Sequence, residues 1–589
     1  MSRFLLLGLL AYLLILLPDL QVITAGVAIF MVGMFFMEDG FKQFTGGPLE
    51  AILRKTTNTV PKSIFSGFVT TSIIQSSSLM SVITISFLSA ELIGLAQGIG
   101  LIFGSNIGTT TTAWIVSSFG LKIKIAHYAM PMLIFGIIFR FMKSKNFHGM
   151  GNVLLGLGFI FLGIGYMKEG FETLKAGIDL AQFAMDGFLG VGIYILVGAI
   201  ATVVIQSSSA TMAIIIVALS EGQIDYVNAL ALAIGANIGT TVTAIIGSLT
   251  SNANGKRLAL AHLIFNAITA GVAVAFIYQL KDLVEWLSPM IGIGAEEYAM
   301  KLTLFHTIFN ILGVLIVSPF VHQLVKYLEK KFTTEASNKG QPKYITDSSA
   351  TIPASALIAI QKESEHLYDN SLEIIAHGMS LHRTAIFSDR ELDNVVLASN
   401  EIMKVDIEKE YTENVKRLYG EIIKFAALAN DDLGEADSQK IYEMKVANRE
   451  IVRAIKDIEK VQKNINKYFK MQNSVIKNEY NILRKKLVDV LRKVQSIRFE
   501  HTDFTDSVTQ LEVLKDELKE IDIIQNGRLD KLIRQNEIDS HMATSLINDS
   551  LYIHNVGHRV IEFAYALWIH DEVLKEYEDL DVEVDEKDS

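Results

Sequence analysis

The sequence predicts an all-α protein: a polytopic membrane domain with two inverted repeats that contain re-entrant helical hairpins, followed by a soluble helical bundle. Charge separates the two parts, because residues 1–325 hold 16 Lys and Arg and 15 Asp and Glu, whereas residues 326–589 hold 37 and 49. All eight prolines lie at or before Pro353. Since proline breaks helix interiors, the proline-free remainder predicts long helices. The third observation is that one stretch of the first part occurs twice in the sequence.

This internal duplication relates Gly67–Ala113 to a second copy 131 residues later, with 21 of 47 positions identical. Each copy carries Gln-Ser-Ser-Ser, at 75–78 and 206–209, and Asn-Ile-Gly-Thr-Thr, at 106–110 and 237–241. The match extends upstream at an offset of 130, where Gly33, Met37, Gly40 and Phe41 correspond to Gly163, Met167, Gly170 and Phe171. The period is far too long for a solenoid repeat. It indicates two halves of one membrane domain.

Apolar runs set the expected boundaries of the membrane domain, residues 1–331. We place repeat 1 at about 21–142, repeat 2 at about 151–280 and an extra helix at 302–325. The apolar run from Phe4 to Leu17 lacks a nearby cleavage site and is interpreted as a retained first membrane segment.

Polar interruptions mark the two predicted hairpins. Ile64–Ser89 and Leu189–Leu219 each hold Gln-Ser-Ser-Ser within apolar sequence, which favours a broken or re-entrant helix over one smooth span. Leu92–Phe119 and Val227–Leu249 hold the Asn-Ile-Gly-Thr-Thr segments. Polar side chains at membrane depth are costly unless they face a cavity, a ligand or another helix. Close helix packing through small residues is the alternative, but packing alone does not require the same Gln and the same Asn twice.

Two further segments share a polar pattern, His262-x-x-Phe265-Asn266 and His306-x-x-Phe309-Asn310. The i, i+4 spacing places each His and Asn on one helix face. We interpret them as partners in interhelical hydrogen bonds that fix packing.

The second part begins after basic residues at 326–331, which mark that side as cytoplasmic by the positive-inside rule. We expect a linker at 332–353, a charged helical domain at 354–578 and an acidic tail at 579–589. The net negative charge of this part argues against nucleic acid or anionic lipid as its partner. The chain has no cysteine, so it has no disulfide framework and no thiolate metal site.

The repeated motifs offer oxygen ligands for a hard cation such as sodium and hydroxyl and amide donors for an oxyanion. Neither copy of the motif region contains a basic residue. A bound anion must therefore be balanced by helix N-termini and by cations that travel with it. This reasoning favours cation-coupled anion uptake by a transporter with inverted repeats; it leaves open sodium or protons, and phosphate or sulfate.

At these motifs the chain resembles the type II sodium–phosphate cotransporters, bacterial members included. The resemblance covers about residues 20–325 and implies a sodium-coupled symporter that imports inorganic phosphate across the cell inner membrane. It implies a substrate site lined by Gln75, Ser76, Ser77, Ser78, Gln206, Ser207, Ser208 and Ser209. Sodium ligands would come from Asn106, Thr109, Thr110, Asn237, Thr240 and Thr241.

The helical tail resembles the PhoU-type domain that bacterial members of this family often carry. PhoU proteins bind metals through paired acidic motifs, whereas only Glu512-x-x-x-Asp516 stands here, so no transition-metal site is assigned. We expect no enzyme activity and no cofactor beyond sodium as the coupling ion. The expected partners are phosphate, sodium and membrane lipid. A homodimer and a cytoplasmic regulatory partner of the tail stay open, as do a phosphate exporter, a symporter of another oxyanion and a membrane-anchored phosphate-status sensor.

Overall fold

The chain forms two compact units in the computed structural model, Met1–Thr333 and Thr334–Ser589. The predicted first segment, up to residue 16, and the acidic tail at 579–589 lie outside the described residues. The structure describes residues 17–45, 53, 56–121, 125–142, 144–177, 185, 187–249, 251–333, 339–350, 352–399, 401–429, 434–499, 504–521, 523–524 and 527–569.

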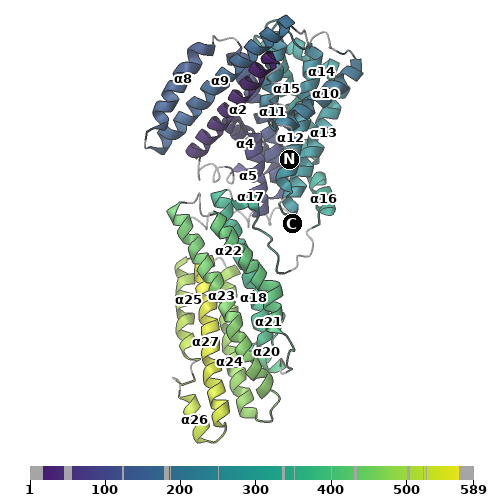
Figure 1. The fold of residues 1–589 in the computed structure, drawn as a ribbon. Coiled ribbons are helices and arrows are strands. Elements are labelled where there is room, and N and C mark those ends of the chain that lie inside the picture. Colours follow the sequence, from purple (N-terminus) through teal and green to yellow (C-terminus); the bar gives the residue numbers. More distant parts are fainter. Residues whose placement is uncertain are drawn as a thin grey trace. The chain divides into compact units, whose positions relative to one another are not determined.

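Unit 1 is helical, and the described residues of the whole chain contain no strand, which confirms the predicted all-α class. In Figure 1 its helices run from purple through blue to teal. They are α2 (Pro18–Thr45), α4 (Val60–Ile74), α5 (Ser77–Ser89), α6 (Leu95–Gly108), α7 (Thr110–Ile115), α8 (Ile125–Arg140), α9 (Lys145–Gly177), α10 (Gly187–Ile205), α11 (Ser208–Ser220), α12 (Tyr226–Ser248), α13 (Ala253–Ala275), α14 (Ile277–Leu287), α15 (Tyr298–Val317) and α16 (Val321–Lys331).

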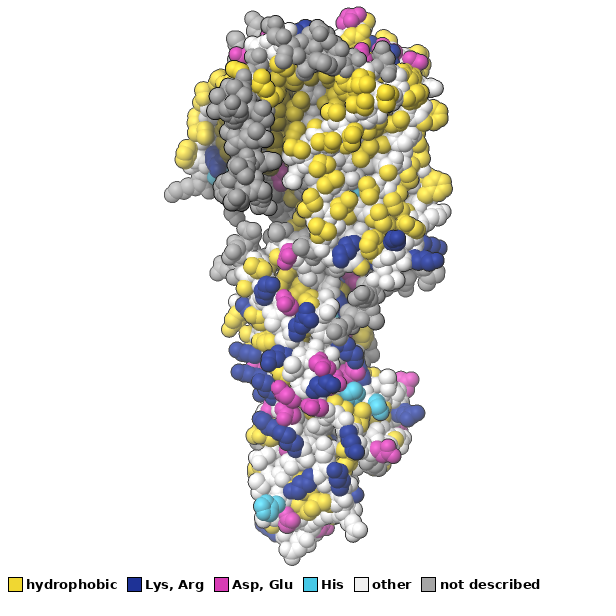
Figure 2. Space-filling model, turned by 45° about the vertical axis from the view of Figure 1, so that its right-hand side comes forward, with side chains coloured by type: hydrophobic (Ala, Val, Ile, Leu, Met, Phe, Trp, Pro, Cys, Tyr) yellow, Lys and Arg dark blue, Asp and Glu magenta, His cyan; other side chains and the backbone are white. Residues whose placement is uncertain are grey.

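Six stretches within the described residues are long and apolar enough to cross a bilayer. They are Leu20–Phe41, Asn146–Lys175, Gly187–Ile205, Tyr226–Ser248, Ala253–Ala275 and Tyr298–Lys331. Hydrophobic side chains dominate the face of this unit seen in Figure 2, as expected for a surface in contact with lipid. The chain is thus a multi-pass membrane protein.

Glycines spaced seven residues apart bring α2 and α9 together. Gly26 meets Gly163, Gly33 meets Gly156, and Gly40 meets Gly149, so the two helices run antiparallel. A Cβ at Gly33 would lie 2.6 Å from the Gly156 carbonyl oxygen. Backbones approach this closely only where side chains are absent. Gly26 of the first copy is equivalent to Gly156 of the second, and Gly33 is equivalent to Gly163, at the offset of 130. The Gly26–Gly163 and Gly33–Gly156 contacts are therefore equivalent to each other, and the interface is formed by matching positions of the two copies.

The last two long helices of the unit pack in corresponding ways. Helix α13 packs against α5 and α6, and α15 packs against α11 and α12. The His-x-x-Phe-Asn segments of α13 and α15 are 44 residues apart. Gly313 of α15 contacts the Thr269 side chain of α13, which is its equivalent at the same offset. Helix α13 also packs against α12, and α15 against α6 and α7, so each of the two helices contacts both copies of the duplication.

Unit 2 is a bundle of long helices with short helices at its loops, drawn in green to yellow in Figure 1. Charged side chains cover much of the surface that Figure 2 shows for it. The long helices are α18 (Pro353–Gly378), α22 (Arg417–Ala429), α23 (Glu435–Tyr468), α24 (Ser474–Phe499), α25 (Phe504–Lys519) and α27 (Ser540–Trp568). The short ones are α17 (Asp347–Ala350), α19 (Arg383–Ile386), α20 (Leu392–Ala398), α21 (Ile407–Tyr411) and α26 (Arg528–Arg534).

The start of this bundle lies inside the segment expected to be a linker. The buried Glu363 carboxylate accepts hydrogen bonds from the backbone amides of Lys343, Tyr344 and Ile345 at 2.8–3.2 Å. Its other oxygen lies 2.8 Å from His366 Nδ1. The Asn370 side chain of α18 also donates to the Lys339 carbonyl oxygen at 2.6 Å, so the chain is attached to the bundle from residue 339 onward, well before α18 begins.

Candidate functional site

Each Gln-Ser-Ser-Ser motif marks the point where one helix ends and the next begins. Gln75 and Gln206 adopt left-handed backbone conformations, with φ of 61° and 58°. Such values are uncommon outside glycine. The next residue caps the following helix, because Ser76 Oγ accepts from Leu79 N and Ser207 Oγ from Ala210 N, both at 3.2 Å. Gln-Ser therefore ends α4 before α5 and α10 before α11 in the same way, and the predicted interruption of both helices is present.

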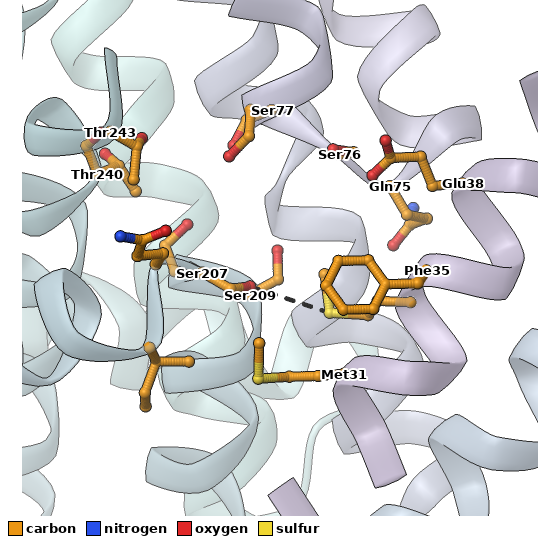
Figure 3. Close-up of a pocket in the computed structure, with 15 residues that line it drawn as sticks. Met31, Phe35, Glu38, Gln75, Ser76, Ser77, Ser207, Ser209, Thr240 and Thr243 are labelled. Atoms are coloured by element: carbon orange, nitrogen blue, oxygen red, sulfur yellow. Dashed lines mark hydrogen bonds between the residues drawn. The ribbon is translucent and has the colours of Figure 1, made fainter. Parts of the chain in front are cut away.

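The two motifs surround one cavity of about 300 Å³. Figure 3 shows Gln75, Ser76 and Ser77 across it from Ser207 and Ser209. All eight residues predicted to bind substrate line this cavity, so the structure brings both copies to one place. The full lining is Met31, Met34, Phe35, Glu38, Gln75, Ser76, Ser77, Ser78, Ile205, Gln206, Ser207, Ser208, Ser209, Thr240 and Thr243.

Backbone amides at the starts of α5 and α11 add donors to this lining. For Ser77, Ser78, Ser208 and Ser209, no hydrogen bond from the backbone amide is found to any described residue. The first amides of a helix have no intrahelical acceptor, and the partial positive charge of a helix N-terminus attracts anions. Two helix N-termini and six serine hydroxyls therefore supply the cavity with donors but with no cationic side chain.

The two glutamines differ in their surroundings. Gln75 is 5 % exposed; its Nε2 donates to Thr111 Oγ1 at 2.7 Å and to the Ser72 carbonyl oxygen, and its Oε1 accepts from Thr112 Oγ1 at 2.7 Å. Gln206 is exposed. The residue of the second copy equivalent to Thr111 is Val242, which has no hydroxyl. Gln206 therefore lacks one of the threonine partners that Gln75 has. Gln75 is thus fixed by its neighbours, whereas Gln206 is accessible from the cavity.

Of the six residues predicted as sodium ligands, Thr240 alone lines the cavity. All four predicted threonines use their hydroxyls locally. Each donates to the carbonyl oxygen three residues earlier in the chain at 2.5–2.8 Å. Their hydroxyl oxygens can still accept or coordinate. The sequence could not show this internal bonding, because it depends on the rotamer that each threonine adopts.

Asn237 belongs to a hydrogen-bonded polar cluster with His306 and Asn310. Its Nδ2 donates to Asn310 Oδ1 at 2.8 Å, and its Oδ1 lies 3.3 Å from His306 Nε2. Asn310 Nδ2 donates to the His306 carbonyl oxygen at 2.8 Å. The predicted interhelical hydrogen bonds are therefore present between α12 and α15.

The corresponding residues of α6 and α13 do not form such a cluster. Asn106 Nδ2, both ring nitrogens of His262 and both side-chain polar atoms of Asn266 are buried, without a hydrogen-bond partner among the described residues. Phe103 and Phe265 stack between the same helices, with ring centroids 4.3 Å apart. The interhelical bonds expected for His262 and Asn266 are thus not made.

Sequence reasoning missed one face of α2. Met31, Met34, Phe35 and Glu38 follow the i, i+3, i+4, i+7 spacing of a single helix face, and all line the cavity. Met34 Sδ lies 4.0 Å from Ser207 Oγ. The spacing could have been read from the sequence, but not the packing of this face against the second copy. Thr243 was also missed, although it is the repeat equivalent of Thr112.

No group of three or more His, Asp or Glu side chains that could hold a metal ion occurs in the described part of the chain. Glu512 accepts from the Tyr565 hydroxyl at 2.7 Å and lies 3.5 Å from Lys515 Nζ, while Asp516 pairs with Lys519 at 2.7 Å. Both carboxylates of the lone acidic motif thus have protein partners.

Comparison with known proteins identifies a family match within the part of the chain that contains the cavity. The family model described as Na+/Pi-cotransporter matches residues 29–169 and 188–304. These ranges include both Gln-Ser-Ser-Ser motifs and exclude the helical bundle. No solved structure matches.

Three relatives illustrate the range of similarity. The uncharacterized protein YqeW of Bacillus subtilis is 29 % identical over 302 residues, which is 51 % of this chain and 94 % of that protein. The putative inorganic phosphate export protein YjbB of Escherichia coli K12 is 23 % identical over 419 residues, covering 69 % of this chain and 74 % of YjbB. The sodium-dependent phosphate transport protein 2C of Mus musculus is 39 % identical over 116 residues, 19 % of each chain. The match to YjbB is too long to be confined to the membrane unit.

Proposed function

We propose that this protein is a sodium-coupled symporter of the type II sodium–phosphate cotransporter family that imports inorganic phosphate across the cytoplasmic membrane. One observation carries the proposal. Two copies of Gln-Ser-Ser-Ser, each at a helix break, line one cavity whose donors are hydroxyls, an amide side chain and the amides of two helix N-termini. The family match and the two relatives named for phosphate transport support phosphate as the substrate.

The proposed substrate residues act on the phosphate oxygens. Ser76–Ser78 and Ser207–Ser209 would donate hydroxyl and backbone hydrogen bonds, and Gln206 would add its amide. Gln75 would position the first motif through Thr111 and Thr112 rather than change partners during transport. Neutral donors can bind an oxyanion without a fixed cation when helix N-termini supply partial positive charge.

Sodium is the proposed coupling ion because the cavity offers neutral and anionic oxygens, which suit a hard cation. A cation that enters with the anion removes most of the charge that would otherwise have to be buried. Thr240 is the proposed sodium ligand nearest to the site; Asn106, Thr109, Thr110, Asn237 and Thr241 remain proposals at a greater distance from the substrate.

Inverted repeats and alternating access complete the proposed mechanism. The antiparallel contacts of α2 and α9, exchanged by the repeat offset, support two copies of opposite orientation. The breaks at Gln75 and Gln206 would then be the tips of hairpins that enter from opposite faces and meet at the substrate. Transport, rather than catalysis, is the activity that this arrangement favours.

The helical bundle is proposed to be a PhoU-like regulatory domain on the cytoplasmic side, as the basic end of α16 favours. Lys330 and Lys331 lie in the last turn of that helix. A regulatory domain would change the rate or the direction of transport without contributing to the substrate site.

Export of phosphate is a second candidate, favoured by the name of YjbB and by the long stretch of chain that matches it. Direction depends on which gradients the carrier couples. The cavity residues bind the same ions in either case.

Reconstituted protein tests both candidates. Proteoliposomes with an inward sodium gradient should accumulate radiolabelled phosphate, and replacing sodium by potassium or choline should abolish the accumulation. Equal uptake in choline would remove sodium from the mechanism. Vesicles preloaded with phosphate and facing an inward sodium gradient address direction, because faster efflux than in sodium-free vesicles would favour export.

A further inference from the structure

A relay of hydrogen-bonding side chains joins the two copies of the duplication at the cavity. It begins at Gln75, whose Nε2 donates to the Ser72 carbonyl oxygen and, at 2.7 Å, to Thr111 Oγ1. It continues through the buried Thr112, whose Oγ1 lies 2.7 Å from Gln75 Oε1 and 3.5 Å from Ser209 Oγ. Ser209 lines the cavity. Thr112 therefore contacts residues of both Gln-Ser-Ser-Ser motifs.

The orientation of the Gln75 amide determines which way the protons point along this relay. A backbone carbonyl oxygen can only accept, so the group beside the Ser72 carbonyl oxygen must be the amide nitrogen of Gln75. Thr111 agrees with this orientation, because its hydroxyl donates to the Gly108 carbonyl oxygen at 2.7 Å and so accepts from Gln75. The amide oxygen, Oε1, is therefore the atom that faces Thr112.

Thr112 has one hydroxyl proton, and the shorter of its two contacts takes it. The amide oxygen of Gln75 cannot donate, so the Thr112 hydroxyl donates to it at 2.7 Å. Toward Ser209 the Thr112 oxygen can then only accept. The Ser209 hydroxyl has no other hydrogen-bond partner among the described residues. Its proton is thus directed to Thr112, and its lone pairs are left to the cavity.

The second copy does not repeat this relay. Thr243, the equivalent of Thr112, donates to the Thr240 carbonyl oxygen at 2.7 Å. Within the described part of the chain, no hydrogen bond joins Thr243 to Ser78, which is the equivalent of Ser209. The relay therefore gives the cavity a single serine hydroxyl whose proton is committed to the other copy.

An acceptor at this place distinguishes oxyanions by their protons. The free backbone amides at the starts of α5 and α11 can donate to any tetrahedral oxyanion. Inorganic phosphate at neutral pH carries at least one proton on its oxygens, whereas sulfate carries none. The P–OH group can donate to the lone pairs of Ser209, but a proton-free oxygen would face them without a hydrogen bond. Polar groups left unpaired in a site removed from water reject the wrong ligand.

We propose that Ser209 Oγ accepts a hydrogen bond from the protonated oxygen of the bound anion, so that the site selects phosphate over sulfate. Thr112 is the positioning residue, because it takes the Ser209 proton and is itself oriented by Gln75. The inference rests on the proposed function for the class of substrate and deepens it. The backbone amide of Ser209 still donates to the anion, whereas its hydroxyl accepts, unlike the hydroxyls of the other five serines.

Competition binding to purified full-length protein measures this selectivity directly. Radiolabelled phosphate is displaced, at saturating sodium and fixed neutral pH, by arsenate, which carries a proton as phosphate does, or by sulfate or monofluorophosphate, which carry none. Thr112→Val removes the hydroxyl and keeps the shape, whereas Thr112→Ser keeps the hydroxyl. Thr84→Val is the matched control, because it removes a buried hydroxyl that donates to the Met80 carbonyl oxygen within α5 at 2.7 Å. Membrane level and monodispersity are determined for each variant.

We expect the wild type to bind the proton-free anions at least about tenfold more weakly than phosphate and arsenate, as the loss of one hydrogen bond implies. Thr112→Val should reduce this ratio by about fivefold or more, because the Ser209 proton can then turn toward the cavity. Thr112→Ser and Thr84→Val should keep the wild-type ratio. A purely structural defect would weaken the binding of all four anions together and leave the ratio unchanged.

The wild-type ratio in correctly inserted Thr112→Val protein would overturn the inference, as would a wild type that binds monofluorophosphate as tightly as phosphate. If Thr112→Val fails to insert, Ser209→Ala decides instead. Loss of the acceptor should weaken the binding of phosphate and spare that of monofluorophosphate, and equal losses for both would contradict the proposal. Failure of the proposed transport is distinguishable, because the wild type would then show the same binding selectivity and carry no phosphate along a sodium gradient.

Discussion

Gln75 and Gln206 occupy equivalent positions of the duplication, yet their side chains differ in burial and in partners. Gln75 holds Thr111 and Thr112 in the interior, whereas Gln206 is exposed in the cavity. One residue type thus serves packing in the first copy and accessibility in the second. The packing explanation of the motif is therefore favoured at Gln75, and the functional explanation is favoured at Gln206.

Replacing each glutamine by alanine should separate these roles. Gln75→Ala removes the nearer acceptor of the buried Thr112 hydroxyl and leaves only Ser209 Oγ at 3.5 Å. The loss costs roughly 1–3 kcal/mol, so thermal stability should fall together with transport. Gln206→Ala should leave stability within about 0.5 kcal/mol and lower the affinity for phosphate. Thermal unfolding in detergent and phosphate uptake at matched membrane levels measure the two effects. Equal losses of stability in both variants would contradict the distinction.

Asp549 is the buried acid of the helical bundle with the clearest pH signature. It is 1 % exposed, and it accepts from the Tyr480 hydroxyl at 2.6 Å and from Asn464 Nδ2 at 2.9 Å. Burial raises the pKa of Asp549 from 3.8 to about 6, although both hydrogen bonds oppose the shift. The folded bundle therefore binds this proton more tightly than the unfolded chain does.

The sign of the pH effect follows from this shift. Because the folded pKa is the higher one, the folded state loses stability as pH rises from about 4 through about 6, by roughly 3 kcal/mol at 1.36 kcal/mol per pKa unit. Asp549→Asn removes this contribution, and its side-chain oxygen can still accept from Tyr480 and Asn464. Urea unfolding of the bundle between pH 4 and 8 should show the variant gaining on the wild type as pH rises. A constant difference across that range would mean that Asp549 does not titrate there.

At the scale of helices, the approach of α2 to α9 depends on glycine at every seventh position. Gly33→Ala would place a methyl group 2.6 Å from both the Gly156 carbonyl oxygen and the Ile160 amide nitrogen. Backbone atoms cannot move aside as a side chain can, so the helices must separate, at a cost of roughly 1–3 kcal/mol. Gly192→Ala in α10 is the matched control, because nothing described lies within 4 Å of its added Cβ. Thermal unfolding should show a loss for Gly33→Ala alone.

The helix pairs α12–α15 and α6–α13 should also respond differently to loss of their asparagines. Asn310→Leu breaks two buried hydrogen bonds and leaves Asn237 Nδ2 without its acceptor, so stability should fall by roughly 1–3 kcal/mol. Asn266→Leu removes side-chain atoms that have no partner among the described residues and should cost less or stabilise. Parallel thermal unfolding of the two variants is the measurement. A larger loss for Asn266→Leu would indicate that its amide is bound to water or an ion.

At the scale of the molecule, hydropathy and charge predicted the division into a membrane part and a helical part because both are properties of composition. The duplication predicted that two motifs would be equivalent, and the structure places them around one cavity. Glu38 could not be assigned to that cavity, because its place depends on α2 packing beside the second copy. Likewise, the anchoring of residues 343–345 by Glu363 depends on a contact between segments that no local pattern records.

The division of the chain at Thr333 leads to the last prediction. Every residue that lines the cavity lies before residue 244, and the polar contacts that hold the two motifs also come from the membrane unit. Protein truncated after Lys331 should therefore insert, bind sodium and carry phosphate with wild-type affinity, while any control by the bundle is lost. Arg257 donates to the Phe332 carbonyl oxygen at 3.0 Å, so a second truncation after Thr333 keeps this contact and serves as the matched control. Uptake kinetics and membrane levels of both truncations are compared with those of the full chain. If both insert normally and neither carries phosphate, the bundle is required for transport and is not a separable regulatory domain.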